Sequence, residues 1–475
     1  MAQRSRPLDP EASALARYGA LLRRWRLASG LSQAELGRKV HVSGDLIGKI
    51  EKAARRPTLD LVKRLDAVLD SSGALTSAGR AAHLADVEAA HGSRTVITGH
   101  SPPSPEQVAK DFHRSWEIVF ADTAKDWRTD MRRREFVRTA GITASASSVA
   151  ALQWLLTEPE IVAHASGSTI VGSDHVLAIR AATIKFRHLD NSVGGAAARH
   201  KILAFLVRHV DPLVQLGRYD ARTGAELLSA TAELMHLLGW ATFDAGQQAT
   251  GQSYLTRALR LEKAAGDEDL GAEILAALSH QASYLRDGRT ALDLARAART
   301  AARRSAMPVL VAETHVLEAH GHACLGASAA CAHALSAAET TLDGINAKPT
   351  PAWIGYFDEA YLAAKFAHCF RELGDGRRAR EFAERSLLME PGYRRGRMFN
   401  LALLATSHAQ LGDVEAACAV AGEAIPLATQ LRSHRAVGYL RGLRAELDPY
   451  ASSALVAALD TRLSDAGFTD PLGNG

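Results

Sequence analysis

The chain has few cysteines and few aromatic residues for its length. Its 475 residues include four cysteines, and Phe, Trp and Tyr together make up 6% of the sequence. The cysteines stand at irregular spacing in alanine-rich sequence, at Cys324, Cys331, Cys369 and Cys418. This pattern argues against a disulfide framework and predicts reduced, buried thiols in a cytoplasmic protein.

Motifs of catalysis are absent as well. The sequence contains no glycine-rich phosphate loop, no Ser-His-Asp elbow and no paired carboxylates in a catalytic context. Its 19 histidines are scattered and nominate no general base. We therefore expect a protein that is not an enzyme and that uses no cofactor.

No stretch has the composition of a membrane span. Residues 132–141, RRREFVRTAG, precede an apolar run that ends at Leu156, and at an N-terminus this combination would resemble a twin-arginine export signal. Here the combination is internal, and Ser, Thr and Gly dilute the apolar run. We expect a helix that docks against the C-terminal domain, and no membrane partner.

Long alternating hydrophobic runs are also missing, whereas alanine is abundant. The sequence therefore predicts an all-α protein. A chain of 475 residues exceeds what one hydrophobic core usually holds, so we expect more than one domain.

Basic residues are concentrated near the N-terminus. Residues 17–69 contain twelve Lys or Arg and five Asp or Glu, a net charge of +7. The whole chain carries only +4, so the remaining residues sum to −3. A local basic excess of this kind indicates a module that binds phosphates.

The same segment has the pattern of two short helices joined by a brief turn, at residues 31–51. Ser32 followed by Glu35 predicts a capping box at the start of the first helix. Ser43 is a favourable N-cap for the second helix. The pattern predicts a helix-turn-helix, whose second helix enters a major groove of DNA.

At these residues the chain resembles a known family. The stretch GLSQAELGRKVHVSGDLIGKIEKAARRP is similar to the Xre class of bacterial helix-turn-helix regulators. His41 replaces the usual turn glycine, which predicts strain at a position that often needs positive φ. Gly44 and Gly48 replace side chains that commonly reach DNA in this class, so fewer base contacts are available.

The resemblance implies which residues contact DNA. The implied positions, from the first motif helix to the loop after the second, are Gln33, Ser43, Gly44, Asp45, Gly48, Lys49, Arg55 and Arg56. In this scheme Lys49 donates to guanine, Asp45 accepts from a cytosine amine, and Gln33 and the two arginines hold phosphates. Alternatively, Asp45 only interacts with the positive end of the helix dipole.

An internal repeat organises the second half of the chain. Five predicted turn residues stand 40, 40, 48 and 38 residues apart, at Gly246, Arg286, Gly326, Gly374 and Gly412. Small residues occupy the fifth and the twelfth position after every one of them: Gly251, Ala291, Cys331, Ala379, Ala417, Ala258, Ala298, Ala338, Ser386 and Ala424. Small residues at such regular sites predict pairs of helices in close contact.

This spacing is similar to that of the tetratricopeptide repeat. The fourth copy matches the signature of that repeat at Phe366, Ala367, Phe370, Gly374, Ala379, Ala383, Ser386 and Pro391. The resemblance covers about residues 225–426, and the period exceeds the 34 residues that are usual. It implies a solenoid of stacked helix pairs with a concave inner face.

The resemblance also implies which side chains line that face. The implied ligand groove comprises Glu233, Trp240, Glu273, His280, Glu313, His320, Tyr361, His368, Phe399 and Thr406. Such a groove is acidic with imidazoles at one end and aromatic at the other, which suits a basic or amine-bearing peptide. Alternatively, these residues are ordinary polar positions of a scaffold or dimerisation surface.

A metal sensor is a further alternative. Soft or borderline ligands cluster in the sequence at His315, His320, His322, Cys324, Cys331 and His333. Their spacing matches no structural zinc pattern, and a helix would disperse several of them around its circumference, so we predict no metal site.

These observations predict four regions. They are a helix-turn-helix domain at residues 15–72, a linker at 73–105, connecting helices at 106–173 and a tetratricopeptide-like domain at 174–465. We expect a cytoplasmic DNA-binding transcriptional regulator whose array senses a peptide or small amine-bearing effector and forms a homodimer on a two-fold DNA operator. The alternative is a DNA-tethered protein-interaction scaffold without a small ligand.

Overall fold

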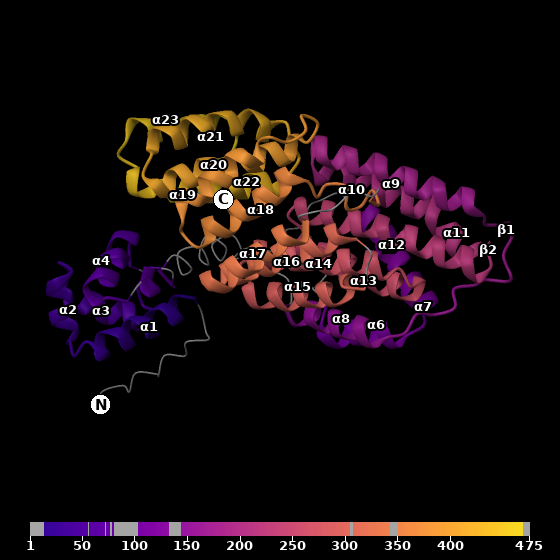
Figure 1. Ribbon diagram of the computed structural model, residues 1–475, viewed down its shortest axis with the longest axis horizontal. Coiled ribbons are helices and arrows are strands. Elements are labelled where there is room, and N and C mark those ends of the chain that lie inside the picture. The colour runs from indigo at the N-terminus through magenta and orange to yellow at the C-terminus, as the bar shows by residue number, and fades with distance from the viewer. Residues whose placement is uncertain are drawn as a thin grey trace. The chain divides into compact units, whose positions relative to one another are not determined.

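The computed structural model describes residues 14–55, 57–71, 73–76, 78–79, 103–132, 144–304, 307–342 and 350–468. The chain divides into two compact units, Met1–Ile97 and Thr98–Gly475, and each is described by itself. The protein is all-α, as the sequence predicts: a helix-turn-helix domain is followed by a solenoid of packed helical hairpins (Figure 1).

The described helices of the first unit are α1 (Ala14–Ala28), α2 (Gln33–Lys39), α3 (Gly44–Glu51) and α4 (Leu59–Leu69). The predicted capping box starts α2, because the amide of Glu35 donates to Ser32 Oγ at 3.2 Å and the amide of Ser32 donates to Glu35 Oε2 at 2.8 Å. Ser43 caps α3 by accepting a hydrogen bond from the amide of Leu46. Both predicted helix starts are therefore confirmed.

One apolar core holds these four helices together. Its buried members are Tyr18, Leu22, Leu36, Val40, Ile47, Ile50, Leu61, Val62, Leu65, Leu69 and Leu75. Every helix of the unit contributes at helical spacing, so no single pair of helices carries the fold. The turn between α2 and α3 contains His41 at φ +56°, which confirms the predicted left-handed position.

The described part of the second unit begins with three helices that pack against the first helix pairs of the solenoid. They are α6 (Pro105–His113), α7 (Trp116–Arg132) and α8 (Ala144–Leu156). Helix α8 is the apolar run that follows the basic stretch, and it packs against α6, α13 (Gln248–Ala265) and α15 (Gly288–Ala302). Among the described residues, no helix is long and apolar enough to cross a membrane.

A mixed segment leads from these helices into the repeats. Its elements are β1 (Thr169–Ile170), α9 (Ser173–Val193), α10 (Gly195–Phe205), the π-helical turn η1 (Leu206–Val210), α11 (Asp211–Leu216) and β2 (Gly217–Arg218). The two short strands pair in parallel, with Thr169 opposite Gly217. They join the loop before α9 to the end of α11.

In the described residues, five helix pairs make up the array. They are α12 (Ala221–Asp244) with α13, α14 (Glu268–Tyr284) with α15, α16 (Pro308–Cys324) with α17 (Ser328–Leu342), α18 (Glu359–Glu372) with α19 (Gly376–Ser386), and α20 (Arg394–Leu411) with α21 (Val414–Thr429). Helix α22 (His434–Glu446), the 3-10 turn η2 (Asp448–Tyr450) and α23 (Ala454–Asp465) complete the chain.

The repeat spacing found in the sequence is confirmed. Each of the five turn residues lies between the two helices of a pair and has positive φ, from +60° at Arg286 to +85° at Gly246. All ten small residues placed by this spacing are buried. At Gly251 an added Cβ would lie 3.1 Å from the carbonyl oxygen of Gly239, so the paired helices touch through their backbones.

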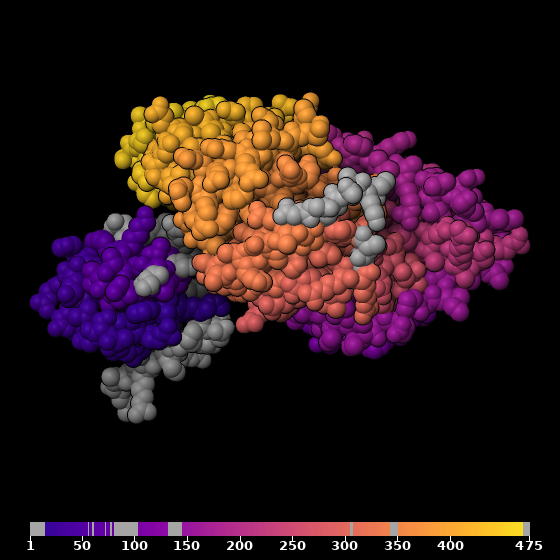
Figure 2. Space-filling view, viewed as in Figure 1, coloured from indigo at the N-terminus to yellow at the C-terminus, as the bar shows by residue number. Residues whose placement is uncertain are grey.

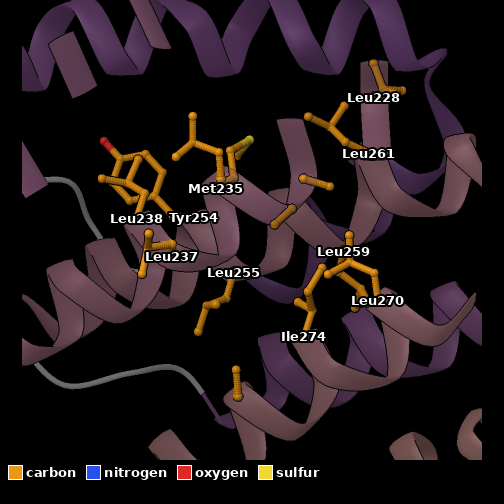
Figure 3. Close-up of a cluster of buried hydrophobic side chains, with 14 of the residues drawn as sticks. Leu228, Met235, Leu237, Leu238, Tyr254, Leu255, Leu259, Leu261, Leu270 and Ile274 are labelled. Carbon is orange, nitrogen blue, oxygen red and sulfur yellow. The ribbon is translucent and has the colours of Figure 1, made fainter. Parts of the chain in front are cut away.

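Leucine-rich packing fills the space between successive pairs. Figure 3 shows side chains from α12, α13 and α14 gathered in one cluster, including Met235, Tyr254, Leu259 and Ile274. The same cluster extends to α6, α8 and α9. The helices before the repeats therefore share one core with the first pairs.

The end of the array packs against its beginning. The amide of Arg432 donates to the carbonyl of Val193 at 2.7 Å, and the amide of Ala196 donates to the carbonyl of Arg432 at 3.1 Å. Arg395 of α20 pairs with Asp190 of α9 at 2.6 Å. On the face shown in Figure 2, the orange C-terminal helices lie beside the magenta early helices. These contacts close the solenoid on itself.

The left-handed residue in the α2–α3 turn gives a stability prediction. We expect His41→Gly to raise the free energy of local opening of α2 and α3 by about 0.5–1 kcal/mol, because glycine adopts positive φ without a Cβ clash. Hydrogen exchange of the α2 and α3 amides measures this free energy. The control is Lys39→Gly at the end of α2, where glycine should lower it by about 1 kcal/mol. A loss of protection in His41→Gly would contradict the prediction.

Candidate functional site

Helix α3, the second helix of the helix-turn-helix, presents one face to the core and one to solvent. Ile47 and Ile50 are buried, whereas Asp45, Lys49 and Lys52 are exposed. The spacing of the exposed residues is i, i+4 and i+7, so they form a stripe along the outer side of α3 and its C-cap. A stripe opposite the core is the part of such a helix that can contact base edges when the helix lies in a major groove of DNA.

Asp45 and Lys49 form an ion pair on this stripe. Lys49 Nζ lies 2.7 Å from Asp45 Oδ2, and the two side chains are 54% and 73% exposed. An exposed pair at this spacing contributes at most about 0.5 kcal/mol, so Lys49 can exchange Asp45 for a base or phosphate at little cost. The pair adds a third role for Asp45, which is to hold Lys49 in position.

Gln33 is attached to a buried ion pair. Its Nε2 donates to Glu51 Oε2 at 2.8 Å, while Arg26 donates to both oxygens of the same carboxylate at 2.5 and 3.0 Å. The hydrogen bond to Glu51 raises the pKa of Arg26. This network joins α1, α2 and α3 in the interior of the unit. The side-chain amide of Gln33 has a second N–H that can donate a hydrogen bond to a phosphate oxygen.

The two glycines of α3 lie next to α2. A Cβ on Gly44 would lie 2.8 Å from Cα of Ala34, and a Cβ on Gly48 would lie 3.0 Å from Oε1 of Gln33. Gly44 therefore allows the backbones of α2 and α3 to approach closely, whereas a side chain at Gly48 would meet the end of the Gln33 side chain. Gly48 is buried and faces the Gln33 side chain, and its contact with DNA stays a prediction.

The remaining positions predicted to contact DNA lie at the ends of α3. Ser43 is exposed and caps the helix, and Arg55 is exposed in the loop that follows. Arg56 lies outside the described residues.

Comparison with known proteins agrees with this geometry. Residues 17–79 match the model of a protein family described as a helix-turn-helix domain. The first unit carries a helix-turn-helix domain. Domains of this kind are typical of DNA-binding regulators. The match concerns the first unit alone, and none of the curated proteins compared matches the chain.

In the array, the structure brings several of the predicted groove residues together. The rings of Trp240 and His280 lie 5.0 Å apart, and those of His320 and His368 stack at 5.7 Å. Glu233 is separate, because it pairs with Arg180 at 2.9 Å and lies 3.7 Å from Arg187. Thr406 donates to the carbonyl of Ala402 within its own helix.

Two buried carboxyl groups meet at the centre of this inner face. The hydroxyl of Tyr356 lies 2.9 Å from Glu273 Oε1 and 2.5 Å from Glu313 Oε1, and Tyr361 lies 3.4 Å from the same oxygen of Glu313. Burial, with the nearby Glu313, raises the pKa of Glu273 well above its usual value, and burial raises that of Glu313. The Tyr356 hydroxyl has one proton to donate, so it can donate to only one of the two carboxyl groups at a time, and their proximity disfavours the state in which both are ionised.

Basic groups lie next to the carboxyl pair. Lys365 Nζ lies 2.5 Å from His280 Nδ1 and 5.2 Å from the centre of the Tyr361 ring. Burial lowers the pKa of Lys365 to about 7 and that of His320 to about 3. Burial also lowers the pKa of His280 and of His368, so these imidazoles are neutral at physiological pH.

Three inner-face residues escaped the sequence analysis. Tyr356 lies in the loop before α18, and Arg435 and Tyr439 lie in α22, so none falls on the repeat spacing. Tyr439 stacks on Phe399 at 4.6 Å, and its hydroxyl lies 3.2 Å from His368 Nε2. The aromatic end of the predicted groove is thus packed against the chain's own α22.

The described residues contain no group of three or more His, Cys, Asp or Glu side chains that could hold a metal ion. All four cysteines are free, and Cys331 occupies a small-residue packing position.

The neutral, buried His320 gives a pH prediction. Because its pKa is about 3 in the folded protein, only the unfolded chain takes up its proton as the pH falls below about 6.5. Stability therefore falls on acidification. We expect the stability difference between the parent protein and His320→Gln to decrease by roughly 1 kcal/mol between about pH 7 and about pH 5.5.

Urea unfolding at the two pH values, followed by circular dichroism, measures this difference. His200→Gln, at an exposed position, serves as the control and should leave the pH dependence of the parent protein unchanged. An equal pH dependence in the parent protein and His320→Gln would show that His320 takes up its proton without unfolding.

Proposed function

We propose that this protein is a DNA-binding transcriptional regulator whose helical array senses a ligand and mediates dimerisation. The observation that carries the DNA-binding part is the exposed stripe of Asp45, Lys49 and Lys52 on the second helix of a helix-turn-helix domain. The stripe lies in the segment with a net charge of +7. Phosphate attraction and base readout can then act from one helix.

Within this proposal the Xre-like residues take separate roles. Lys49 reads a base, Asp45 holds Lys49 or accepts from a cytosine amine, and Arg55 and the free N–H of Gln33 contact phosphates. Arg56 belongs to the same phosphate set through the sequence resemblance. Because Gly44 and Gly48 carry no side chain, few side chains of α3 are available for direct readout, and DNA shape supplies part of the specificity.

The ligand-sensing part rests on unsatisfied polar atoms of the tetratricopeptide-like array. Glu273 Oε2, Glu313 Oε2, His320 Nδ1 and His368 Nδ1 are buried without a hydrogen-bond partner. Buried polar atoms without partners are costly, and these four, of which the two carboxyl oxygens can accept, come from three successive inner helices. They support an effector that donates hydrogen bonds, such as a peptide or small molecule bearing an amine.

The proposed dimerisation is argued from the small DNA surface that one helix-turn-helix domain buries. One helix-turn-helix domain buries little DNA surface, so useful affinity needs two copies on a two-fold operator. We propose that the array joins the two copies and that the protein acts in the cytoplasm, where such an operator lies. The alternative, a DNA-tethered scaffold without a small ligand, keeps the first unit's role and assigns the array to a protein partner.

DNA binding is tested on the promoter region of the protein's own gene. We expect the protein to reduce the electrophoretic mobility of this DNA fragment in a gel at low salt. We expect Lys49→Ala to weaken specific binding by about 1–3 kcal/mol. The matched control is Lys110→Ala in α6, which removes the same charge from an exposed position of the second unit. Absence of retardation by the parent protein would refute the regulator proposal, and an unchanged operator preference in Lys49→Ala would remove Lys49 from base readout.

Ligand sensing is tested by native mass spectrometry of protein purified from its host. We expect a bound amine-bearing molecule, and we expect Glu273→Gln to lose it, because an amine favours ionisation of the carboxyl pair, and glutamine keeps the side-chain shape but cannot ionise. The affinity of ligand-free Glu273→Gln for the promoter should equal that of the parent protein. Promoter retardation without any co-purifying small molecule or peptide would favour the scaffold alternative.

A further inference from the structure

A single arginine of α22 is enclosed by aromatic rings. The guanidinium carbon of Arg435 lies 4.7 Å from the ring centre of Phe399, 5.0 Å from Phe243, 5.4 Å from Tyr284 and 5.9 Å from Trp240. These distances are in the range of cation–π attraction, and we call the four rings the Arg435 cage. Arg435 itself is buried.

The cage exists only because the array closes on itself. Trp240 and Phe243 belong to α12, Tyr284 to α14 and Phe399 to α20, so the rings come from the first, second and fifth helix pairs. Next to the cage, Ser433 donates to Asp244 Oδ1 at 2.8 Å. Occupation of the cage by Arg435 is thus coupled to the contacts that join the two ends of the solenoid.

The charge of Arg435 is incompletely compensated. Within the described residues no carboxylate lies within ion-pair distance of its guanidinium, and its buried Nε has no hydrogen-bond partner. Arg395, in the same closing interface, has both Asp190 and Asp244 as partners. A buried cation without an anion is costly, and aromatic faces offset only part of that cost. The cage therefore fits a guanidinium but leaves its present occupant open to competition.

We propose that the Arg435 cage is a guanidinium-binding site of the array, held in cis by Arg435, and that an arginine-bearing peptide competes for it and opens the closed solenoid. This inference rests on the proposed ligand sensing and names the chemistry of the effector. Ala436, Leu440 and Leu443 anchor α22 to α20, α21 and α23. A competitor therefore displaces the first turn of α22 and the Ser433–Asp244 bond, while the rest of α22 stays on the C-terminal helices.

The probe is a labelled peptide with the sequence of residues 433–440, SHRAVGYL, which contains one arginine. The peptide is tested against the full-length variant Arg435→Met. This substitution keeps an apolar side chain at the position but removes the guanidinium from the Arg435 cage. We expect the peptide to bind this variant at least about tenfold more tightly than the parent protein, in which the linked Arg435 competes at high effective concentration. A peptide with citrulline in place of arginine should not bind. Arg444→Ala, whose side chain pairs with Asp460 and Asp448, is the control and should behave like the parent protein.

Equal affinity of the peptide for the parent protein and Arg435→Met, binding of the citrulline peptide, or no binding to either protein overturns the proposal. If Arg435→Met does not fold, hydrogen exchange on the parent protein decides. Saturating peptide should then increase exchange of the Arg432 amide, which is bonded to Val193, and the citrulline peptide should not. No increase overturns the proposal. Neither assay involves DNA, so a failure of the Arg435 cage proposal can be distinguished from a failure of the protein to bind its promoter.

Discussion

Close approach of helix backbones at small side chains is the constraint on which both units depend. In the array, the ten glycine, alanine, serine and cysteine positions set by the repeat are all buried between paired helices. In the helix-turn-helix domain, Gly44 serves the same purpose between α2 and α3. A larger side chain at such a site forces the backbones apart, typically at a cost of about 1–3 kcal/mol. In the array, pairs held this closely can stack through leucine-rich cores and curve far enough for α20 and α22 to reach α9 and α12.

What could be predicted from the sequence follows from the range of the interactions. The capping box at Ser32, the left-handed His41 and the turns of the repeat depend on neighbours a few residues away, and the structure confirms them. Tyr356, Arg435 and Tyr439 were missed because they lie off the repeat spacing and meet their partners only after the solenoid closes. The burial of Gly48 was missed for a similar reason, since a glycine looks the same in sequence whether it faces DNA or a neighbouring helix.

The inner face differs from an open groove in a way that bears on function. Its carboxyl pair is bonded to Tyr356, and its aromatic end is packed against α22. In our proposal, the ligand therefore replaces contacts that the chain already makes, and its binding free energy is linked to closure of the array. That linkage gives a physical route from ligand to DNA in our proposal, because a change in the curvature of the array alters the spacing of two joined readers. In the same proposal, the two glycines of α3 make this spacing more important, since few side chains remain for direct readout.

The most direct test of the account is a hydroxyl-radical footprint of the protein on its own promoter region. We expect two protected half-sites related by two-fold symmetry, with centres one or more helical turns of about 10.5 base pairs apart. That result would place two helix-turn-helix domains in successive major grooves on one side of the DNA. Protection of a single half-site, or protection without a regular spacing, would contradict a dimeric regulator whose array sets the distance between its readers.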